Sequence, residues 1–156
     1  METHLIGVLD AEEKSTITRT ILSSLPEWFG IPESTEAYIQ NCRAMPFVAA
    51  MEGEAAVGFL ALKETSPNAM EVHVMGILPA HHRKGIGRAL CDWAYQYARA
   101  HQYDFLHVKT LVASANCAEY DRTRAFYLAM GFKPLECLRE LWDERNPCLL
   151  LVRTVR

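Results

Sequence analysis

Apolar residues recur at steps of three and four along the chain between residues 86 and 100. The positions that share this spacing are Ile86, Leu90, Trp93, Ala94, Tyr97 and Ala98. Such spacing places side chains on one face of an amphipathic helix. The preceding run, residues 70–78, is rich in β-branched residues and is followed by Pro79, which predicts a strand. The pattern therefore predicts a strand and a helix joined by a short turn.

The start of the chain predicts another amphipathic helix. Ile17, Ile21 and Leu25 lie four residues apart and would share one face. Asp10 precedes them and, with Glu13, resembles an N-terminal capping box. We therefore expect a helix over residues 11–25.

A second helix is expected from about residue 32 to residue 43, because a proline at 32 suits the first helical position. Trp28 and Phe29 lie in the loop between the two helices. They either plug the space beneath the helix pair or line a substrate pocket, and the sequence leaves both interpretations open.

The remaining apolar runs have the length of strands. They cover residues 5–9, 47–51, 55–63, 105–112, 132–141 and 147–154. The acidic turn at 52–54 joins two of them as a hairpin, so the first four strands are expected to form an antiparallel meander. A loop is expected at 113–120 and another connection at 142–146, with a helix before Gly131, which would end it in the left-handed conformation.

Composition fits a single globular domain over residues 1–156. Half of the 156 residues are hydrophobic and 22% are charged, which argues against disorder. A net charge of −3 disfavours a general nucleic-acid surface. No apolar run reaches the length of a membrane span, and the acidic N-terminal stretch does not resemble a signal peptide. We therefore expect a cytoplasmic protein without nucleic-acid or membrane partners.

Cysteine and histidine spacing indicates neither a disulfide framework nor a metal site. The five cysteines are an odd number without a CxxC pair, and the six histidines lack HxxxH spacing. Reduced thiols and no bound metal are expected.

The turn before the helix, from His81 to Arg88, is rich in glycine and in positive charge. The first backbone N–H groups of a helix lack intrahelical acceptors and carry partial positive charge. Gly85 and Gly87 let a ligand approach the backbone closely. The cationic side chains nearby are Arg83, Lys84 and Arg88. The turn predicts a site for a diphosphate or a similar polyanion, against the alternative of a solvated basic turn.

This turn resembles the acetyl-coenzyme A signature of the GNAT superfamily of N-acetyltransferases, Arg/Gln-x-x-Gly-x-Gly/Ala, through His82-Arg83-Lys84-Gly85-Ile86-Gly87. A later segment, Thr123 to Phe132, resembles the family's helix that ends Phe-Tyr-x-x-x-Gly-Phe. The two motifs occur in the family's order, and the resemblance covers nearly the whole chain. The one departure is His82, where the signature has Arg or Gln.

The resemblance implies an α+β (mixed α/β) domain with a mostly antiparallel sheet flanked by helices. The sheet is expected to be splayed between its central strands, 70–78 and 105–112. Acetyl-coenzyme A is the implied acyl donor, and backbone groups around Met75, Gly76 and Ile77 are expected to face it. Packing alone is the alternative explanation for Gly76. The turn residues expected to hold the cofactor are His82, Arg83, Lys84, Gly85, Ile86, Gly87 and Arg88.

Acetyl transfer needs an acid for the leaving thiolate and a base for the amine. Tyr127 occupies the tyrosine of the second motif, so the resemblance implies that it protonates the thiolate; packing is the alternative. Glu71 matches a catalytic glutamate of the family's histone-acetylating branch and is our first choice of base. His73 lies on the same strand face and is the second choice, and water is the third route.

The resemblance implies direct transfer of acetyl to a primary amine. An acetyl-cysteine route through Cys91 is less favoured, because nothing marks this residue as a nucleophile. A catalytically silent coenzyme A-binding sensor and a transferase for another acyl group stay open, as does a homodimer. Acidic residues could attract a polyamine or an aminoglycoside, but a solvated helix face explains them better. These residues are Glu27, Glu33, Glu36, Glu119 and Asp121.

Overall fold

The computed structural model describes residues 2–111, 118–143 and 146–156 of the chain. The described strands form one sheet in the order β1-β2-β3-β4-β5-β7-β6. The described residues also contain four α-helices. The strands are β1 (Thr3–Gly7), β2 (Phe47–Glu52), β3 (Ala55–Ser66), β4 (Ala69–Ile77), β5 (Phe105–Leu111), β6 (Lys133–Asp143) and β7 (Asn146–Thr154). The helices are α1 (Ala11–Leu22), α2 (Pro32–Asn41), α3 (Ile86–Ala100) and α4 (Ala118–Ala129). The expected α+β class is therefore confirmed.

Backbone contacts divide the chain into two compact units. The first unit comprises Met1–Lys63 and Val72–Tyr97, and the second comprises Glu64–Glu71 and Ala98–Arg156. Strands β3 and β4 and helix α3 each contribute to both units, so the chain passes between the units within regular elements. A single domain over residues 1–156 stays a prediction.

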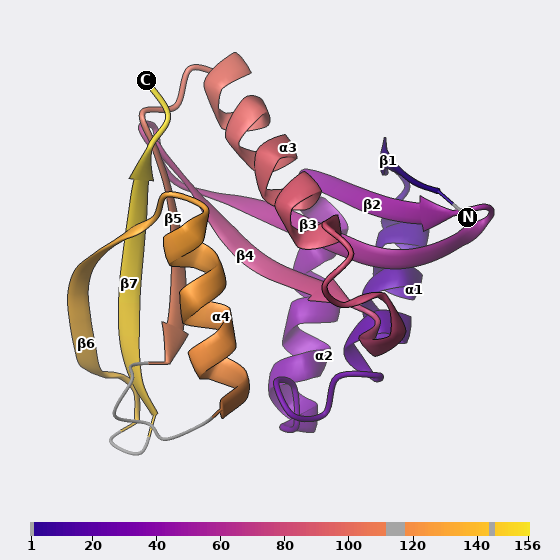
Figure 1. Cartoon of the computed structure of the whole chain (residues 1–156), viewed down its shortest axis with the longest axis horizontal. Coiled ribbons are helices and arrows are strands. Elements are labelled where there is room, and N and C mark those ends of the chain that lie inside the picture. Colours follow the sequence, from indigo (N-terminus) through magenta and orange to yellow (C-terminus); the bar gives the residue numbers. More distant parts are fainter. Residues whose placement is uncertain (1, 112–117, 144–145) are drawn as a thin grey trace. The chain divides into compact units, whose positions relative to one another are not determined.

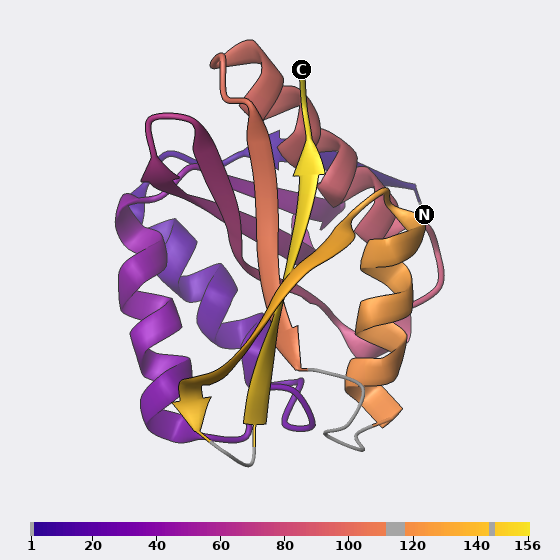
Figure 2. The same cartoon turned by 90° about the vertical axis from the view of Figure 1, so that its left-hand side faces the viewer.

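In the first unit, helices α1 and α2 lie on one face of the β2–β4 strands and α3 lies on the other (Figure 1; Figure 2). Alternation along β3 explains this division, because successive strand residues point to opposite faces. A Cβ at Gly58 would lie 3.3 Å from the side chain of Ile86, the first residue of α3. The next residue, Phe59, instead joins the buried cluster that contains Ile21 and Leu22 of α1.

Helix α1 begins as its sequence predicts. The Asp10 carboxylate accepts a hydrogen bond of 2.9 Å from the backbone N–H of Glu13, which caps the helix. The helix ends at Leu22 rather than at the expected Leu25. Leu25 is still buried, because its N–H bonds to the Leu22 carbonyl in a tighter turn that continues the apolar face.

In the second unit, β7 pairs with both β5 and β6 in antiparallel register. The start of β4 pairs with β5 in parallel, with Glu71 opposite His107. Helix α4 packs against β5 (Figure 1). A splay of β4 and β5 beyond these paired residues stays a prediction.

Two predicted connections in the second unit are corrected, and parts of both lie outside the described residues. The expected loop at 113–120 is corrected at its end, because 118–120 form the first turn of α4; residues 112–117 are not described. The expected connection at 142–146 is also corrected, because Trp142 and Asp143 belong to β6 and Asn146 to β7; residues 144–145 are not described. The predicted turn at Gly131 is confirmed by its φ of 95°.

In the described part of the chain, no helix is both long enough and apolar enough to span a bilayer.

Candidate active site

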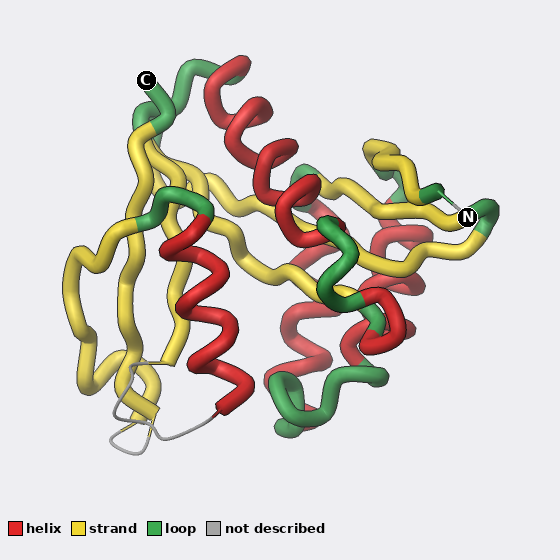
Figure 3. The backbone as a smooth tube through the Cα atoms, viewed as in Figure 1, coloured by secondary structure: helices red, strands yellow, loops and turns green. Residues whose placement is uncertain are grey.

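The turn between β4 and α3 has two residues in left-handed conformation. Arg83 has a φ of 63° and Gly85 a φ of 80°. Glycine adopts this conformation without steric cost, whereas an arginine there is unusual and indicates a constrained backbone. Figure 3 shows the irregular segment that holds both residues, between a short helical turn and the start of α3.

The Gly85 carbonyl accepts a hydrogen bond of 3.1 Å from the N–H of Ala89, so Gly85 stands at the N-cap position of α3. Glycine has no side chain with which to cap the helix. The N–H groups of residues 86–88 therefore have no acceptor within the helix, and the helix dipole adds positive charge to them. This is the arrangement expected of an anion site.

Two histidines anchor the turn to neighbouring strands. His82 Nε2 donates to the backbone carbonyl of Ile77 over 2.7 Å, and its ring meets Trp28 edge-on at 5.8 Å. His81 Nε2 lies 3.1 Å from a carboxylate oxygen of Glu52, at the end of β2. His82 is thus engaged with the protein, and we expect its contribution to be the position of the turn.

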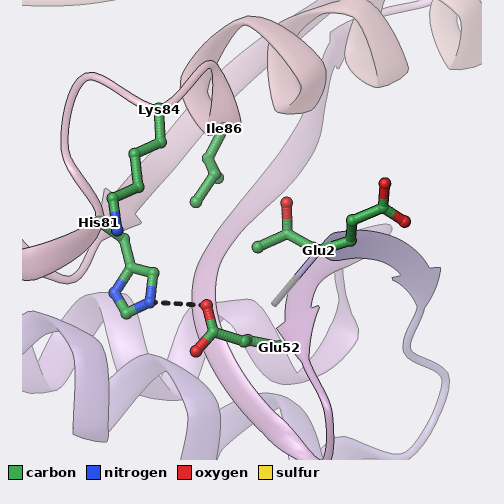
Figure 4. A pocket seen from close by; sticks show the side chains of 6 residues that line it. Glu2, Glu52, His81, Lys84 and Ile86 are labelled. Atoms are coloured by element: carbon green, nitrogen blue, oxygen red, sulfur yellow. Dashed lines mark hydrogen bonds and ion pairs between the residues drawn. The ribbon is translucent and has the colours of Figure 1, made fainter.

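A pocket beside the turn is lined by Glu2, Thr3, Glu52, His81, Lys84 and Ile86. Figure 4 shows Lys84 and His81 reaching from the turn while Glu52 meets His81 from β2. Carboxylates and cations share this lining, so the pocket does not favour a polyanion. Arg83, Lys84 and Arg88 are exposed, whereas the Ile86 side chain is buried toward Gly58. The Ile86 side chain borders the pocket but is almost fully buried (Figure 4).

Packing explains the glycine of the central strand. A Cβ at Gly76 would lie 3.0 Å from the side chain of Ile21 and 3.1 Å from that of Phe59. A larger residue there would fit only if the side chains of Ile21 and Phe59 shifted. A backbone contact of Met75, Gly76 and Ile77 with the cofactor stays a prediction.

Glu71 is buried, and its carboxylate lies 2.5 Å from Lys109 Nζ. Lys109 comes from β5, two residues beyond His107, the register partner of Glu71. Sequence reasoning missed both residues of β5, because only the pairing of the strands brings them to Glu71. His73, the second candidate base, instead contacts Tyr38 of α2, with ring centroids 5.3 Å apart.

Trp28 and Phe29, in the loop between α1 and α2, pack near Tyr38 of α2 in the first unit. Phe29 meets the Tyr38 ring edge-on at 5.8 Å, and both pack with Trp28 against the buried cluster under α1. The interpretation as a hydrophobic plug is therefore supported. All three are only partly buried, so they also offer apolar surface to a ligand.

Tyr127 lies in the last turns of α4 and is 5% exposed. Its ring contacts Phe126 at 5.3 Å and Phe132 at 5.4 Å. Its carbonyl accepts the N–H of Phe132, just after the left-handed Gly131. The second sequence motif therefore folds as a helix end with Tyr127 packed on it, and the role of its hydroxyl as an acid stays a prediction.

No described cysteine forms a disulfide, and three of the four described cysteines are buried. Burial raises the pKa of Cys42 and of Cys148 to about 11, so both are protonated at neutral pH. Cys91 is fully buried. Cys117 lies outside the described residues. Within residues 2–111, 118–143 and 146–156, no cluster of three metal-ligating side chains occurs.

The acidic residues considered for acceptor binding are in part engaged with the protein. Glu36 binds Arg19 through two hydrogen bonds of 2.9 and 3.0 Å. Asp121 pairs with Arg124 one turn along α4. Both observations favour paired helix faces over a cation-binding patch. The side chain of Glu119 is outside the described residues.

Comparison with known proteins gives one family. The sequence profile of the Acetyltransferase (GNAT) family matches residues 16–132. No curated protein matches the sequence. A solved acetyltransferase of the GNAT family from Desulfovibrio desulfuricans is similar, with 17% identity, a TM-score of 0.86, and coverage of 99% of this chain and 100% of that one.

Two further solved structures share the fold. An aminoglycoside 6'-N-acetyltransferase complexed with coenzyme A has 14% identity and a TM-score of 0.74, with 97% of each chain covered. The ribosomal-protein-S18-alanine N-acetyltransferase from Escherichia coli has 13% identity and a TM-score of 0.74, covering 99% of this chain and 94% of that one. At these identities the likeness concerns the fold.

Proposed function

Because the chain belongs to the GNAT acetyltransferase family, we propose that it transfers an acetyl group from acetyl-coenzyme A to a primary amine by direct attack. The observation that carries the proposal is the glycine-capped start of α3. Its backbone N–H groups have no side-chain cap, and the exposed cationic residues Arg83, Lys84 and Arg88 are close to them in sequence. A coenzyme A diphosphate is the ligand class that this arrangement suits.

The turn supplies most of the proposed cofactor contacts. Backbone N–H groups of Ile86, Gly87 and Arg88 bind the diphosphate, and Gly85 leaves the approach open, since no atom lies within 4 Å of its Cβ direction. The exposed cationic side chains of Arg83 and Lys84 attract the negatively charged cofactor. His82 holds the turn in position through its hydrogen bond to the Ile77 carbonyl. Met75, Gly76 and Ile77 face the cofactor through backbone.

The proposed chemistry moves one proton from nitrogen to sulfur. The amine nitrogen attacks the thioester carbonyl carbon, an N–C bond forms, and the C–S bond breaks with its electron pair leaving on sulfur. Tyr127 gives its hydroxyl proton to the thiolate, which suits a group with a pKa of about 10. Glu71 and His73 are the two bases that the strand offers, with water as the third route.

Glu71 has an obstacle as the base. Its carboxylate is engaged with Lys109 at 2.5 Å, and this ion pair stabilises the charged form that a base must give up on protonation. A sensor that binds coenzyme A without turnover is consistent with that pair. The identities of the acceptor amine and of the acyl group that is transferred are also to be determined by experiment.

One experiment separates these functions. Purified protein is mixed with acetyl-, propionyl- or succinyl-coenzyme A and a panel of spermidine, an aminoglycoside, a lysine peptide and a peptide with a free N-terminus. Thiol release above the amine-free control, with a mass gain of the acyl group on one amine, supports the proposal. Tight calorimetric binding of acetyl-coenzyme A with no amine-dependent thiol release contradicts it and favours the sensor.

A further inference from the structure

The ring of Trp28 packs against the turn between β4 and α3. Trp28 belongs to the loop between α1 and α2, and its ring meets that of His82 edge-on, with centroids 5.8 Å apart and an angle of 83° between the planes. Both residues belong to the first unit. An edge-to-face contact at this distance is favourable and fixes how the two rings lie. The contact therefore joins the loop between the two helices to the proposed cofactor turn.

The orientation of the His82 ring decides whether the turn is anchored to β4. His82 Nε2 lies 2.7 Å from the carbonyl oxygen of Ile77, the last residue of that strand. A carbonyl oxygen only accepts hydrogen bonds, so Nε2 carries hydrogen and donates it. Rotation of the imidazole would break this bond, because the N–H would then point away from the oxygen. Trp28 opposes such a rotation, since its ring packs against the imidazole.

The backbone that follows His82 depends on this anchor. Arg83 comes next and has a φ of 63°, a conformation that costs free energy for a residue with a Cβ. Such a conformation persists only where the surrounding contacts hold it. Two residues further on, the Gly85 carbonyl accepts the N–H of Ala89 and so starts α3. The position of His82 therefore sets where the first N–H groups of the helix lie.

The loop that carries Trp28 is itself tied to the rest of the first unit. The N–H groups of Trp28 and Phe29 donate to the carbonyl of Leu25 over 3.1 and 2.9 Å, and Leu25 is buried in the core under α1. The hydroxyl of Thr35 in α2 donates to the Phe29 carbonyl over 3.2 Å. Both helices thus hold the loop, so it is a fixed support for the Trp28 ring.

We propose that Trp28 is a positioning residue for coenzyme A binding, which acts by holding the His82 ring against the Ile77 carbonyl. The inference rests on the function proposed above, in which the start of α3 binds the diphosphate. Trp28 acts through His82 in this role and not through a contact with the cofactor. The N–H groups of residues 86–88 are then in place before the ligand arrives, so binding needs less ordering of the turn.

The test is a double-mutant cycle on acetyl-coenzyme A affinity, measured by titration calorimetry on the full chain. Trp28→Leu should weaken the affinity about three- to tenfold, the range expected for loss of an edge-to-face ring contact. His82→Ala removes the hydrogen bond to Ile77 and should weaken it about tenfold. The double variant should bind within about twofold of His82→Ala, because the effect of Trp28 passes through the His82 ring.

Phe29→Leu is the matched control for the loss of packing. Phe29 lies in the same loop and packs, like Trp28, against the buried cluster under α1, but its ring meets Tyr38. This variant should lower the melting temperature about as much as Trp28→Leu does, and should keep acetyl-coenzyme A affinity within about twofold of wild type. Trp28→Phe keeps an aromatic ring in the loop and should restore most of the affinity that Trp28→Leu loses.

A further measurement uses wild type and needs no variant to fold. Nitrogen-edited NMR at pH 7 should show hydrogen on Nε2 of His82, as the bond to the Ile77 carbonyl requires. Addition of acetyl-coenzyme A should move both this signal and the indole N–H signal of Trp28, because the two rings are in contact.

Four results would overturn the inference with the proposed function intact. These are wild-type affinity in Trp28→Leu while Gly87→Val binds more weakly, an undiminished effect of Trp28→Leu in the His82→Ala background, hydrogen on His82 Nδ1 alone, and an indole signal that saturating cofactor does not move. The two NMR results decide the matter if Trp28→Leu does not fold. If wild type itself does not bind acetyl-coenzyme A, the proposed function fails and the role of Trp28 falls with it.

Discussion

The carboxylate of Glu71 and the ammonium of Lys109 form an ion pair of 2.5 Å between adjacent strands of the second unit. Glu71 is buried, while about a third of the Lys109 side chain is exposed. Water can solvate the partly exposed Lys109 ammonium, whereas the buried Glu71 carboxylate relies on Lys109 to stabilise its negative charge. The stability of this strand pair should reflect that asymmetry.

Lys109→Met should leave the Glu71 carboxylate buried without its cation. We expect the free energy of unfolding to fall by about 1–3 kcal/mol, the usual cost of an unsatisfied buried polar group. Urea denaturation at pH 7 measures this loss. The double variant Glu71→Gln/Lys109→Met removes both charges and should recover at least half of it. A double variant that is less stable than Lys109→Met alone would contradict the dependence.

Gly76→Ala should destabilise the first unit, because its Cβ would meet Ile21 and Phe59 at 3.0 and 3.1 Å. We expect a loss of about 1–3 kcal/mol, in the range of overpacked cores. Gly7→Ala is the matched control, since no atom lies within 4 Å of a Cβ there, and it should change stability by less than about 0.5 kcal/mol. Equal stability of the two variants would contradict this prediction and would mean that the side chains around Gly76 shift to accept the new methyl group at little cost.

Gly87→Val should weaken coenzyme A binding, because a β-branched side chain would stand where the diphosphate approaches the helix start. Titration calorimetry should show affinity reduced by well over tenfold, or about 1.4 kcal/mol. The melting temperature serves as the control and should stay within a few degrees. Unchanged affinity would mean that the turn does not cradle the phosphates.

Tyr127→Phe keeps the ring contacts with Phe126 and Phe132 and removes only the hydroxyl. If the hydroxyl protonates the thiolate, turnover should fall by about 10²–10⁴-fold while acetyl-coenzyme A affinity is nearly intact. Stopped-flow or single-turnover assays ensure that chemistry limits the rate. Wild-type turnover in the variant would make Tyr127 a packing residue. A joint loss of affinity and melting temperature would make the hydroxyl structural.

The sequence predicted those features that depend on neighbouring residues. Helix α3 and its basic turn follow from local spacing, and the structure places Gly85 at the helix start with a positive φ, where a glycine is expected. The Asp10 cap and the left-handed Gly131 are local in the same sense. The family follows from two such local motifs, and the profile match confirms it.

Predictions failed where a boundary lacked a local marker. Residues 118–120 belong to α4 and Trp142 belongs to β6, although the sequence was interpreted as loop in both places. The composition of these short stretches does not exclude either state. Packing of the flanking elements then decides which state forms.

Sequence alone determined the order of elements, the turn that suits a diphosphate and the family, because backbone propensity and helix periodicity act over a few residues. Tertiary structure alone decided that Glu71 is paired with Lys109 and that His107 lies beside both. Parallel strands meet through a long connection, so nothing in either segment fixes their register. These three residues became neighbours only when β4 paired with β5.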